Sequence, residues 1–235
     1  MKTPLLSFLF FLVIFGACIS DRQPASAVDY SLLVNPFIGT DFTGNTYPGA
    51  QAPFGMVQLS PDNGLPGWDR ISGYYYPDST IAGFSHTHLS GTGAGDLYDI
   101  SYMPVTLPYR EAEAPLGIHS KFRHSDEEAS AGYYRVLLKD YNINVELTAT
   151  ERCGIQRYTF PKAQSAVFLN LKKAMNWDFT QDSHIEVVDS CTIQGYRFSD
   201  GWARGQRVFF RTRFSKPFRS SEIDTTAIIQ DGKTI

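Results

Sequence analysis

The sequence predicts an all-β fold, an antiparallel β-sandwich, and three observations support that prediction. Short runs rich in Val, Ile, Thr, Tyr and Phe recur along the chain, separated by Gly, Pro or Asp/Asn pairs. No long stretch shows the three-to-four-residue periodicity of an amphipathic helix. A chain of 235 residues with 14% aromatic side chains is also long enough to bury the sizeable core that a sandwich needs.

The first residues, 1–18, have the form of a targeting segment. Lys2 supplies a positive charge, Leu5–Ile14 is almost unbroken hydrophobic sequence, and small residues precede Cys18. The apolar run is too short for a comfortable membrane span. Phe15–Cys18 resembles a bacterial lipobox, which predicts a lipoprotein-type signal peptide and lipidation of Cys18. Ordinary signal cleavage near Ser20 is the alternative, and either route exports the protein.

A short polar segment, residues 19–27, is expected to be a tether, and the folded domain is expected over residues 28–235. Its C-terminal end is expected to be incomplete. Ala227–Ile235 has the pattern of a strand, a turn and the opening of a further strand. A hairpin cut there would leave an unpaired edge, so we expect this chain to be the front part of a longer protein.

The expected strands share β-rich composition and short length. They are Phe54–Ser60, Ser72–Tyr76, Leu97–Pro104, Tyr133–Lys139, Ile143–Thr150, Gly154–Phe160, Ala166–Leu171, His184–Val188, Thr192–Phe198 and Arg207–Phe214. Polar and apolar residues alternate from Asn144 to Ala149, the pattern of a half-buried strand. The turn Asp140–Asn142 predicts a hairpin there, and Pro61–Gly64 is a strong turn signal. Ser125–Ala131, with Ser125 as N-cap, is the best helical candidate.

Charge and cysteine content exclude some functions. The formal net charge is −3, and Lys and Arg are scattered, so nucleic-acid binding is not expected. With Cys18 assigned to lipid, Cys153 and Cys191 remain. Export permits a disulfide between them, but two buried free thiols are the simpler expectation. Their spacing is not that of a metal site.

The stretch Gly83–Asp96 gathers imidazole, hydroxyl and carboxylate groups on glycine-rich backbone. His86 and His88 would share one face of an extended segment, so they could bind a metal with Asp96 as third ligand. Alternatively they orient the loop or contact a neutral ligand. A phosphate-binding loop should open a helix, whereas the following sequence is strand-like, so nucleotide binding is not expected.

Trp68 and Asp69 lie in a turn-rich region, within Gly67–Arg70, where an indole stands beside a carboxylate and the guanidinium of Arg70, a combination common in sugar binding. The indole can stack on a pyranose face while the two charged groups bridge vicinal hydroxyls. Covering an edge of the core is an equally simple role for this tryptophan. A glycosidase pair of acids could be drawn from several carboxylates, but spacing favours no two of them. These carboxylates are Asp41, Asp62, Asp69, Asp96 and Asp99.

Several unusual motifs together resemble glycoside hydrolase family 92, in order along nearly the whole expected domain. They are Asn35–Thr40, Gly44–Ala50, Pro53–Asp62, Gly83–Gly93, Gly132–Val136, Glu146–Thr150 and Phe214–Phe218. The resemblance implies a calcium-dependent inverting exo-α-mannosidase of two domains, a supersandwich-like N-terminal β-sandwich and a C-terminal (α/α)6 barrel. It implies that the catalytic acid, the base and most calcium contacts belong to the barrel, which this chain lacks. No residue here is therefore assigned a catalytic or metal-binding role.

The same resemblance implies that loops of this domain help to form a mannose pocket at the domain interface. The expected substrate-binding residues are Trp68, Asp69, His86, His88, Ser90, Gly91 and Asp96. The expected partners are a mannose-containing glycan and the barrel of the same polypeptide, with membrane attachment through the lipid anchor alone. The expected location is the periplasm or the outer membrane and cell surface. The alternative function is a stand-alone carbohydrate-binding lipoprotein without hydrolase activity.

Overall fold

The computed structural model describes residues 28–109, 112, 117–172, 175–218, 220–224 and 227–230. The expected signal peptide, the tether and Cys18 lie outside these residues. The chain divides into two compact units, and all strands belong to the second, Ser31–Ile235. The described residues include no helix that is long and apolar enough to cross a membrane.

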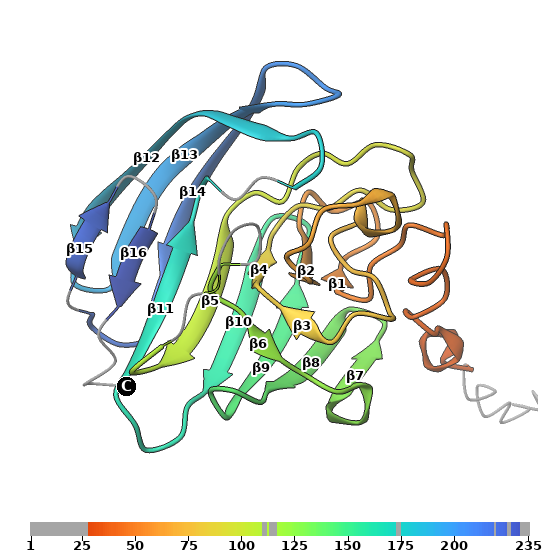
Figure 1. Cartoon of the computed structure of the whole chain (residues 1–235), viewed down its shortest axis with the longest axis horizontal. Coiled ribbons are helices and arrows are strands. Elements are labelled where there is room, and N and C mark those ends of the chain that lie inside the picture. The colour runs from red at the N-terminus through yellow and green to blue at the C-terminus, as the bar shows by residue number, and fades with distance from the viewer. Residues whose placement is uncertain are drawn as a thin grey trace, which may run out of the picture. The chain divides into compact units, whose positions relative to one another are not determined.

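Within the described residues the chain forms strands and short 3₁₀ turns (Figure 1). The strands are β1 (Ala50–Gln51), β2 (Gln58–Asp62), β3 (Thr80–Ile81), β4 (Gly83–Ser85), β5 (Ser101–Thr106), β6 (Ser120–Lys121), β7 (Glu127–Ser130), β8 (Tyr133–Leu138), β9 (Ile143–Ala149), β10 (Gly154–Thr159), β11 (Ser165–Asn170), β12 (Phe179–Asp189), β13 (Thr192–Asp200), β14 (Gln206–Arg213), β15 (Ser220–Asp224) and β16 (Ala227–Gln230). The 3₁₀ turns are η1 (Tyr30–Leu33), η2 (Trp68–Arg70) and η3 (His124–Asp126).

The strands pair into a seven-stranded sheet of order β1-β2-β4-β5-β11-β16-β15, a four-stranded sheet β10-β9-β8-β7 and a three-stranded sheet β12-β13-β14. Strands β3 and β6 form a separate pair. The pairings are antiparallel. The all-β antiparallel sandwich predicted from the sequence is therefore confirmed.

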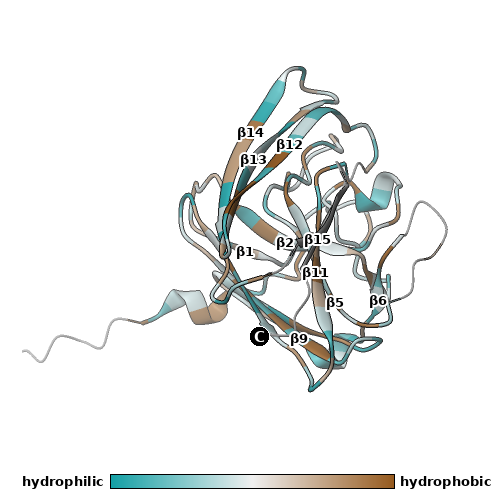
Figure 2. Ribbon diagram, turned by 90° about the vertical axis from the view of Figure 1, so that its left-hand side faces the viewer, coloured by the Kyte–Doolittle hydropathy of each residue, from teal (hydrophilic) through white to brown (hydrophobic). Residues whose placement is uncertain are grey.

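Strands β5 and β11 are buried on both faces, because the two smaller sheets cover opposite sides of the largest one. Successive side chains of a strand point to opposite faces. Met103 of β5 accordingly packs in a core with β8 and β9, whereas its neighbour Tyr102 packs in a second core with β13 and β14. Figures 1 and 2 show β5 and β11 between these layers. Each buried Val, Leu or Phe stabilises the fold by about 1.5–3 kcal/mol.

The predicted hairpin around Asp140–Asn142 is confirmed. Strands β8 and β9 pair antiparallel, with Leu138 opposite Ile143. Val145 and Leu147 are buried in the core, while Asn144 and Thr148 are exposed, as the alternation predicts. The tight turn between these antiparallel strands needs a residue that tolerates positive φ, and Asn142 adopts φ 53° there.

The predicted helix over Ser125–Ala131 is wrong. Only His124–Asp126 forms a turn of 3₁₀ helix, and Glu127–Ser130 is strand β7, paired with β8. The reason is tertiary. The Glu127 carboxylate accepts hydrogen bonds from the hydroxyls of Tyr74 (2.9 Å) and Tyr134 (2.7 Å), which draw it onto the sheet.

Several predicted strand boundaries are also wrong near the site. Pro61 and Asp62, expected to begin a turn, belong to strand β2, because they pair with Phe84 and Gly83 of β4. Phe54 instead forms a turn at φ 58°. Ser72–Tyr76 is not a strand, and Leu97–Ile100 precedes β5 as irregular backbone.

The predicted strand at the C-terminal end is present as β16, which pairs with β11 and β15. The expected turn beyond it lies outside the described residues. Both described cysteines are free thiols, but Cys153 is exposed and Cys191 half-buried, so the expected burial is wrong.

Candidate functional site

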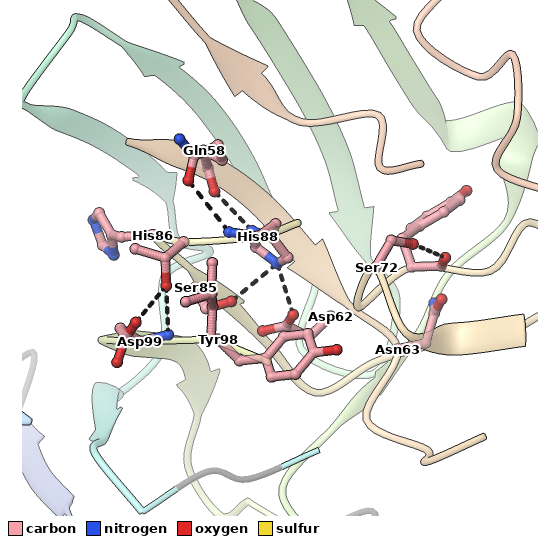
Figure 3. Close-up of polar contacts among 12 residues, drawn as sticks. Gln58, Asp62, Asn63, Ser72, Ser85, His86, His88, Tyr98 and Asp99 are labelled. Carbon is pink, nitrogen blue, oxygen red and sulfur yellow. Dashed lines mark hydrogen bonds and ion pairs between the residues drawn. The ribbon is translucent and has the colours of Figure 1, made fainter. Parts of the chain in front are cut away.

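The two histidines at the end of β4 point away from each other, as Figure 3 shows. His88 is buried, and its Nδ1 donates to the carbonyl oxygen of Gln58 at 2.7 Å. Its Nε2 lies 2.9 Å from Oδ1 of Asp62 and 3.0 Å from Oγ of Ser85. Both ring nitrogens therefore already have oxygen partners inside the protein. His88 fixes the start of the glycine-rich segment from within.

His86 has a different set of neighbours. Its Nδ1 donates to the carbonyl oxygen of Ile100 at 2.8 Å, and its ring meets Tyr102 edge-on. Burial lowers the pKa of His86, so its neutral form is favoured in the fold. The two imidazoles do not converge on one point. Among the described residues, no group of three or more His, Cys, Asp or Glu side chains is placed to hold a metal ion.

The segment that follows the glycine run is strained. Leu97, Tyr98 and Ile100 have φ values of 86°, 65° and 55°, in the left-handed region that non-glycine residues rarely adopt. Such backbone persists only where the surroundings impose it. The Tyr98 hydroxyl donates to the carbonyl oxygen of Ile71 at 2.5 Å, and both groups are buried.

A buried ion-pair network supplies the rest of that constraint. Arg197 of β13 is fully buried, and its Nη1 lies 2.6 Å from Oδ1 of Asp99. The same guanidinium pairs with Asp178, and Thr87 donates to the other oxygen of Asp99 at 2.7 Å. Burial raises the pKa of Asp178 to about 6 although Arg197 opposes this. The network joins β13, the strained segment and the histidine-bearing segment.

All three tryptophans of the chain surround the glycine-rich run. Trp68 is 55% exposed, and a Cβ added to Gly93 would lie 3.4 Å from its ring. The amide of Trp177 donates to the carbonyl oxygen of Gly95 at 3.3 Å, and its ring meets that of Trp68 edge-on at 6.1 Å. Trp202, in the β13–β14 turn, is 77% exposed. Exposed indole surface from three segments, gathered around one loop, is typical of a binding site.

Asn176 positions the first two tryptophans. Its Oδ1 accepts a hydrogen bond from the amide of Gly67 at 2.9 Å, directly before Trp68 and directly beside Trp177 in the chain. Gly95 must be a glycine here, because a Cβ would lie 2.6 Å from that of Asn176. The Asp69 carboxylate is half-exposed and lies in the electrostatic field of Arg70, whose guanidinium forms its ion pair with Asp78 at 2.6 Å.

Asp96 has an internal partner set. It is 1% exposed, and its two carboxylate oxygens accept hydrogen bonds from the backbone amides of Trp202 (2.9 Å) and Ala203 (2.7 Å). A groove of about 470 Å³ lies above this contact. It is lined by Leu89, Thr92, Gly93, Ala94, Asp96, Leu97, Trp202, Ala203 and Gln206. Asp96 therefore shapes the groove by holding its far wall.

The structure thus brings most of the predicted site residues together around one loop. Trp68, Asp69, Ser90 and Gly91 lie at the surface, whereas His88 and Asp96 lie beneath it. Sequence reasoning missed further residues that shape this surface. They are Asn176, Trp177, Arg197 and Trp202. The Trp-Asp pair at 177–178 repeats the pair at 68–69, and that repetition is the one signal that could have found Trp177.

Comparisons with known proteins agree on one family. The profile of the glycosyl hydrolase family 92 N-terminal domain matches residues 33–234. A family GH92 α-mannosidase of Bacteroides thetaiotaomicron, solved with mannoimidazole, is 33% identical with a TM-score of 0.76, covering 86% of this chain and 30% of the mannosidase. A family GH92 inverting mannosidase of Bacteroides thetaiotaomicron VPI-5482 is 25% identical with a TM-score of 0.67, covering 87% and 28%.

A curated relative, an "Uncharacterized secreted glycosidase" of Arthroderma benhamiae, is 28% identical over 138 residues, which is 54% of this chain and 17% of the relative. The chain thus spans less than a third of the length of these relatives. The family profile covers nearly all the described residues, and the solved relatives share the fold. The chain belongs to glycosyl hydrolase family 92, as an N-terminal domain of that family.

Proposed function

We propose that this chain is the substrate-pocket domain of an exported, calcium-dependent inverting α-mannosidase that acts on mannose-containing glycans. Family membership and the names of the solved relatives support this proposal. The observation that carries it is the exposed indole of Trp68 beside the half-exposed carboxylate of Asp69. The turn that bears both is fixed by Asn176.

Each group has a distinct task in binding a terminal mannose. The Trp68 ring would stack on the apolar face of the pyranose, and Asp69 would accept hydrogen bonds from hydroxyls. Ser90 and Gly91 are exposed at the rim of the same loop. His88 and Asp96 would act from beneath, since their polar atoms already bond to the protein. We infer that they position the loop and do not touch the sugar.

We infer that hydrolysis uses acid and base groups outside the described residues. An inverting mechanism needs a carboxylic acid for the leaving oxygen and a carboxylate that activates water on the opposite face. Of the buried carboxylates near the loop, Asp62, Asp96, Asp99 and Asp178 are committed to His88, backbone amides or Arg197. We assign the acid and base to a C-terminal (α/α)6 barrel of the same polypeptide.

Calcium prefers six to eight oxygen ligands. No cluster of candidate metal-ligating side chains occurs among the described residues, so they do not fit such a site. We assign the ion to the barrel domain.

Export is part of the same proposal. The sequence of residues 1–18 and the secreted relative support it. Lipidation of Cys18 would hold the protein at the membrane, in the periplasm or at the cell surface. Labelling cells with a palmitate analogue tests this, and an unlabelled mature protein would reject the lipid anchor.

The deciding experiment compares binding with hydrolysis. We expect the homogeneous 235-residue chain to bind mannoimidazole in saturation-transfer NMR and to leave an aryl α-mannoside intact. Trp68→Ala should abolish the binding, whereas Phe209→Ala, which removes a ring on β14 from a residue that is 70% exposed, should not. Turnover by the chain alone would refute the assignment of the catalytic groups to another domain.

A second measurement separates the proposal from a stand-alone carbohydrate-binding lipoprotein. The protein isolated from its native membrane should hydrolyse α-mannosides and release the β-anomer first, as NMR of the reaction would show. Binding without hydrolysis by that native protein would instead support the binding lipoprotein.

A further inference from the structure

We propose that the groove between residues 89–97 and the β13–β14 turn is a second sugar subsite, in which Trp202 is the stacking platform. It would take the hexopyranose linked to the one at Trp68, so the inference rests on the proposed function and extends it. Neither the family match nor the relatives' names assign a role to this groove.

The groove is a built feature and not a chance gap between loops. The Asp96 carboxylate, 1% exposed, holds the amides of Trp202 and Ala203 from below. A Cβ at position 201 would lie 2.3 Å from Oδ1 of Asp96, so the contact requires Gly201. Gln206 adds donation from Nε2 to the carbonyl oxygen of Ala203 at 3.2 Å. The turn that presents Trp202 is therefore fixed at its base.

The lining has the composition that sugars need. Leu89, Ala94, Leu97 and Trp202 provide apolar surface, and at 77% exposure the indole is open to a ligand. The Thr92 hydroxyl in this lining bonds to the backbone of Ala94, and Gln206 uses its Nε2 on Asp96 and Ala203. The Oε1 of Gln206 accepts no hydrogen bond within the described part of the chain, so it is the polar group offered to a ligand. Ligand sites of this kind combine a mostly apolar lining with a few placed polar groups. A volume of about 470 Å³ is within the range of small-molecule sites.

Gly93 links the two surfaces. A Cβ added to Gly93 would lie 3.4 Å from the Trp68 ring, and Gly93 also lines the groove together with Trp202. The amide of Gly93 donates no hydrogen bond within the described part of the chain. A disaccharide laid across Gly93 would therefore meet one indole with each sugar and pass a free backbone donor between them.

The chain's three tryptophans allow a direct test. Labelling the full chain with 5-fluorotryptophan should give one ¹⁹F signal for each indole, assigned by the single variants W68F, W177F and W202F. Methyl α-mannoside should shift the Trp68 signal and leave that of Trp202 unchanged. An α-linked mannobiose of matching linkage, taken from the 1,2, 1,3 and 1,6 isomers, should shift both. Trp202→Ala should weaken mannobiose binding about tenfold and leave the monosaccharide affinity unchanged.

Two variants control for indirect effects. Asp96→Asn keeps Trp202 but releases its turn, so it should also lose the preference for the disaccharide. Phe209→Ala should change neither affinity, because that exposed ring lies on β14, outside the groove. Preserved dispersion of the remaining ¹⁹F signals would show that each variant is folded.

The outcomes distinguish loss of the second subsite from loss of sugar binding at Trp68. If the Trp68 signal moves with every mannoside while that of Trp202 stays fixed with all three mannobioses, the second subsite is refuted and the first stands. If no signal moves, the sugar-binding role of the whole domain fails. If Trp202 responds equally to methyl α-mannoside or to cellobiose, the groove is a nonspecific aromatic surface and the inference is again refuted.

Discussion

The backbone amide of Trp202 lies 2.9 Å from Oδ1 of Asp96, a residue 106 positions earlier in the chain. The sequence suggests Asp96 as a ligand for metal or sugar, but its carboxylate instead holds the backbone of Trp202 in place. The two sides of the groove depend on each other through this contact. Substitutions at Asp96 should therefore be visible at Trp202.

Replacing Asp96 with Asn should lower the free energy of unfolding by about 2 kcal/mol, because an amide NH₂ would face a backbone N–H donor. Urea denaturation measures the loss, and hydrogen exchange should show faster exchange at the amides of Trp202 and Ala203. Asp182→Asn is the control. Asp182 is exposed on β12 and accepts from the Tyr196 hydroxyl at 3.0 Å, so its change should stay within about 0.5 kcal/mol. Equal losses in the two variants would contradict the role of Asp96.

Replacing Arg197 with Met should cost about 3–5 kcal/mol of unfolding free energy, because Asp99 and Asp178 would be buried without their cation. The matched control is Arg157→Met. That arginine side chain is 70% exposed and pairs with Glu146 at the surface, so about 0–1 kcal/mol is expected. Chemical denaturation at neutral pH measures both. Partial recovery in the double variant R197M/D178N would identify uncompensated charge as the cause.

The raised pKa of Asp178 predicts a specific pH dependence. Its pKa is about 6 in the fold against 3.8 as the ordinary value, so the folded protein holds the proton more tightly. This group therefore makes stability fall as pH rises from about 4 to about 6, with no further change above. The unfolding free energy of the wild type minus that of Asp178→Asn should therefore decrease as pH rises from about 4 to about 6. A flat difference over that range would show that the Asp178 carboxyl is not shifted.

Gly95→Ala should cost more stability than Gly91→Ala, although both lie in the same loop. The added Cβ at position 95 would lie 2.6 Å from that of Asn176, whereas a Cβ at position 91 meets no atom within 4 Å. Position 91 has φ 67°, so its variant should lose about 1 kcal/mol through backbone strain alone. Only Gly95→Ala should also perturb Trp68 fluorescence, since Asn176 holds the turn before that ring. The reverse order of stabilities would be inconsistent with this packing.

The sequence predicted those parts of the structure whose cause is local. The β8–β9 hairpin follows from alternation in residues 143–149 and from a turn that Asn142 can adopt. The region around Glu127 could not be predicted in this way. Its conformation depends on the hydroxyl of Tyr74, 53 positions earlier, and a local pattern carries no information about that partner.

The candidate site shows the same division. Trp68, Asp69 and the glycine run stand out as residue types, and they do lie together. Trp202 is brought to the same loop only by the Asp96 contact, and the strained backbone after the loop depends on Arg197 from β13. Sequence spacing showed neither relationship, because both join segments about 100 residues apart.

Strands β5 and β11 contribute to both cores, so neighbouring residues in one strand report on different interiors. Val105 and Phe168 pack in the core shared with β8 and β9, whereas Tyr102 and Val167 pack in the core shared with β13. Val105 lies opposite Ala166, and Val167 lies opposite Pro104, the next pair along the same two strands. Methyl probes at these two valines could therefore follow the two interiors separately. If one outer sheet loosens before the other during unfolding, these two valines will lose their native chemical shifts at different denaturant concentrations.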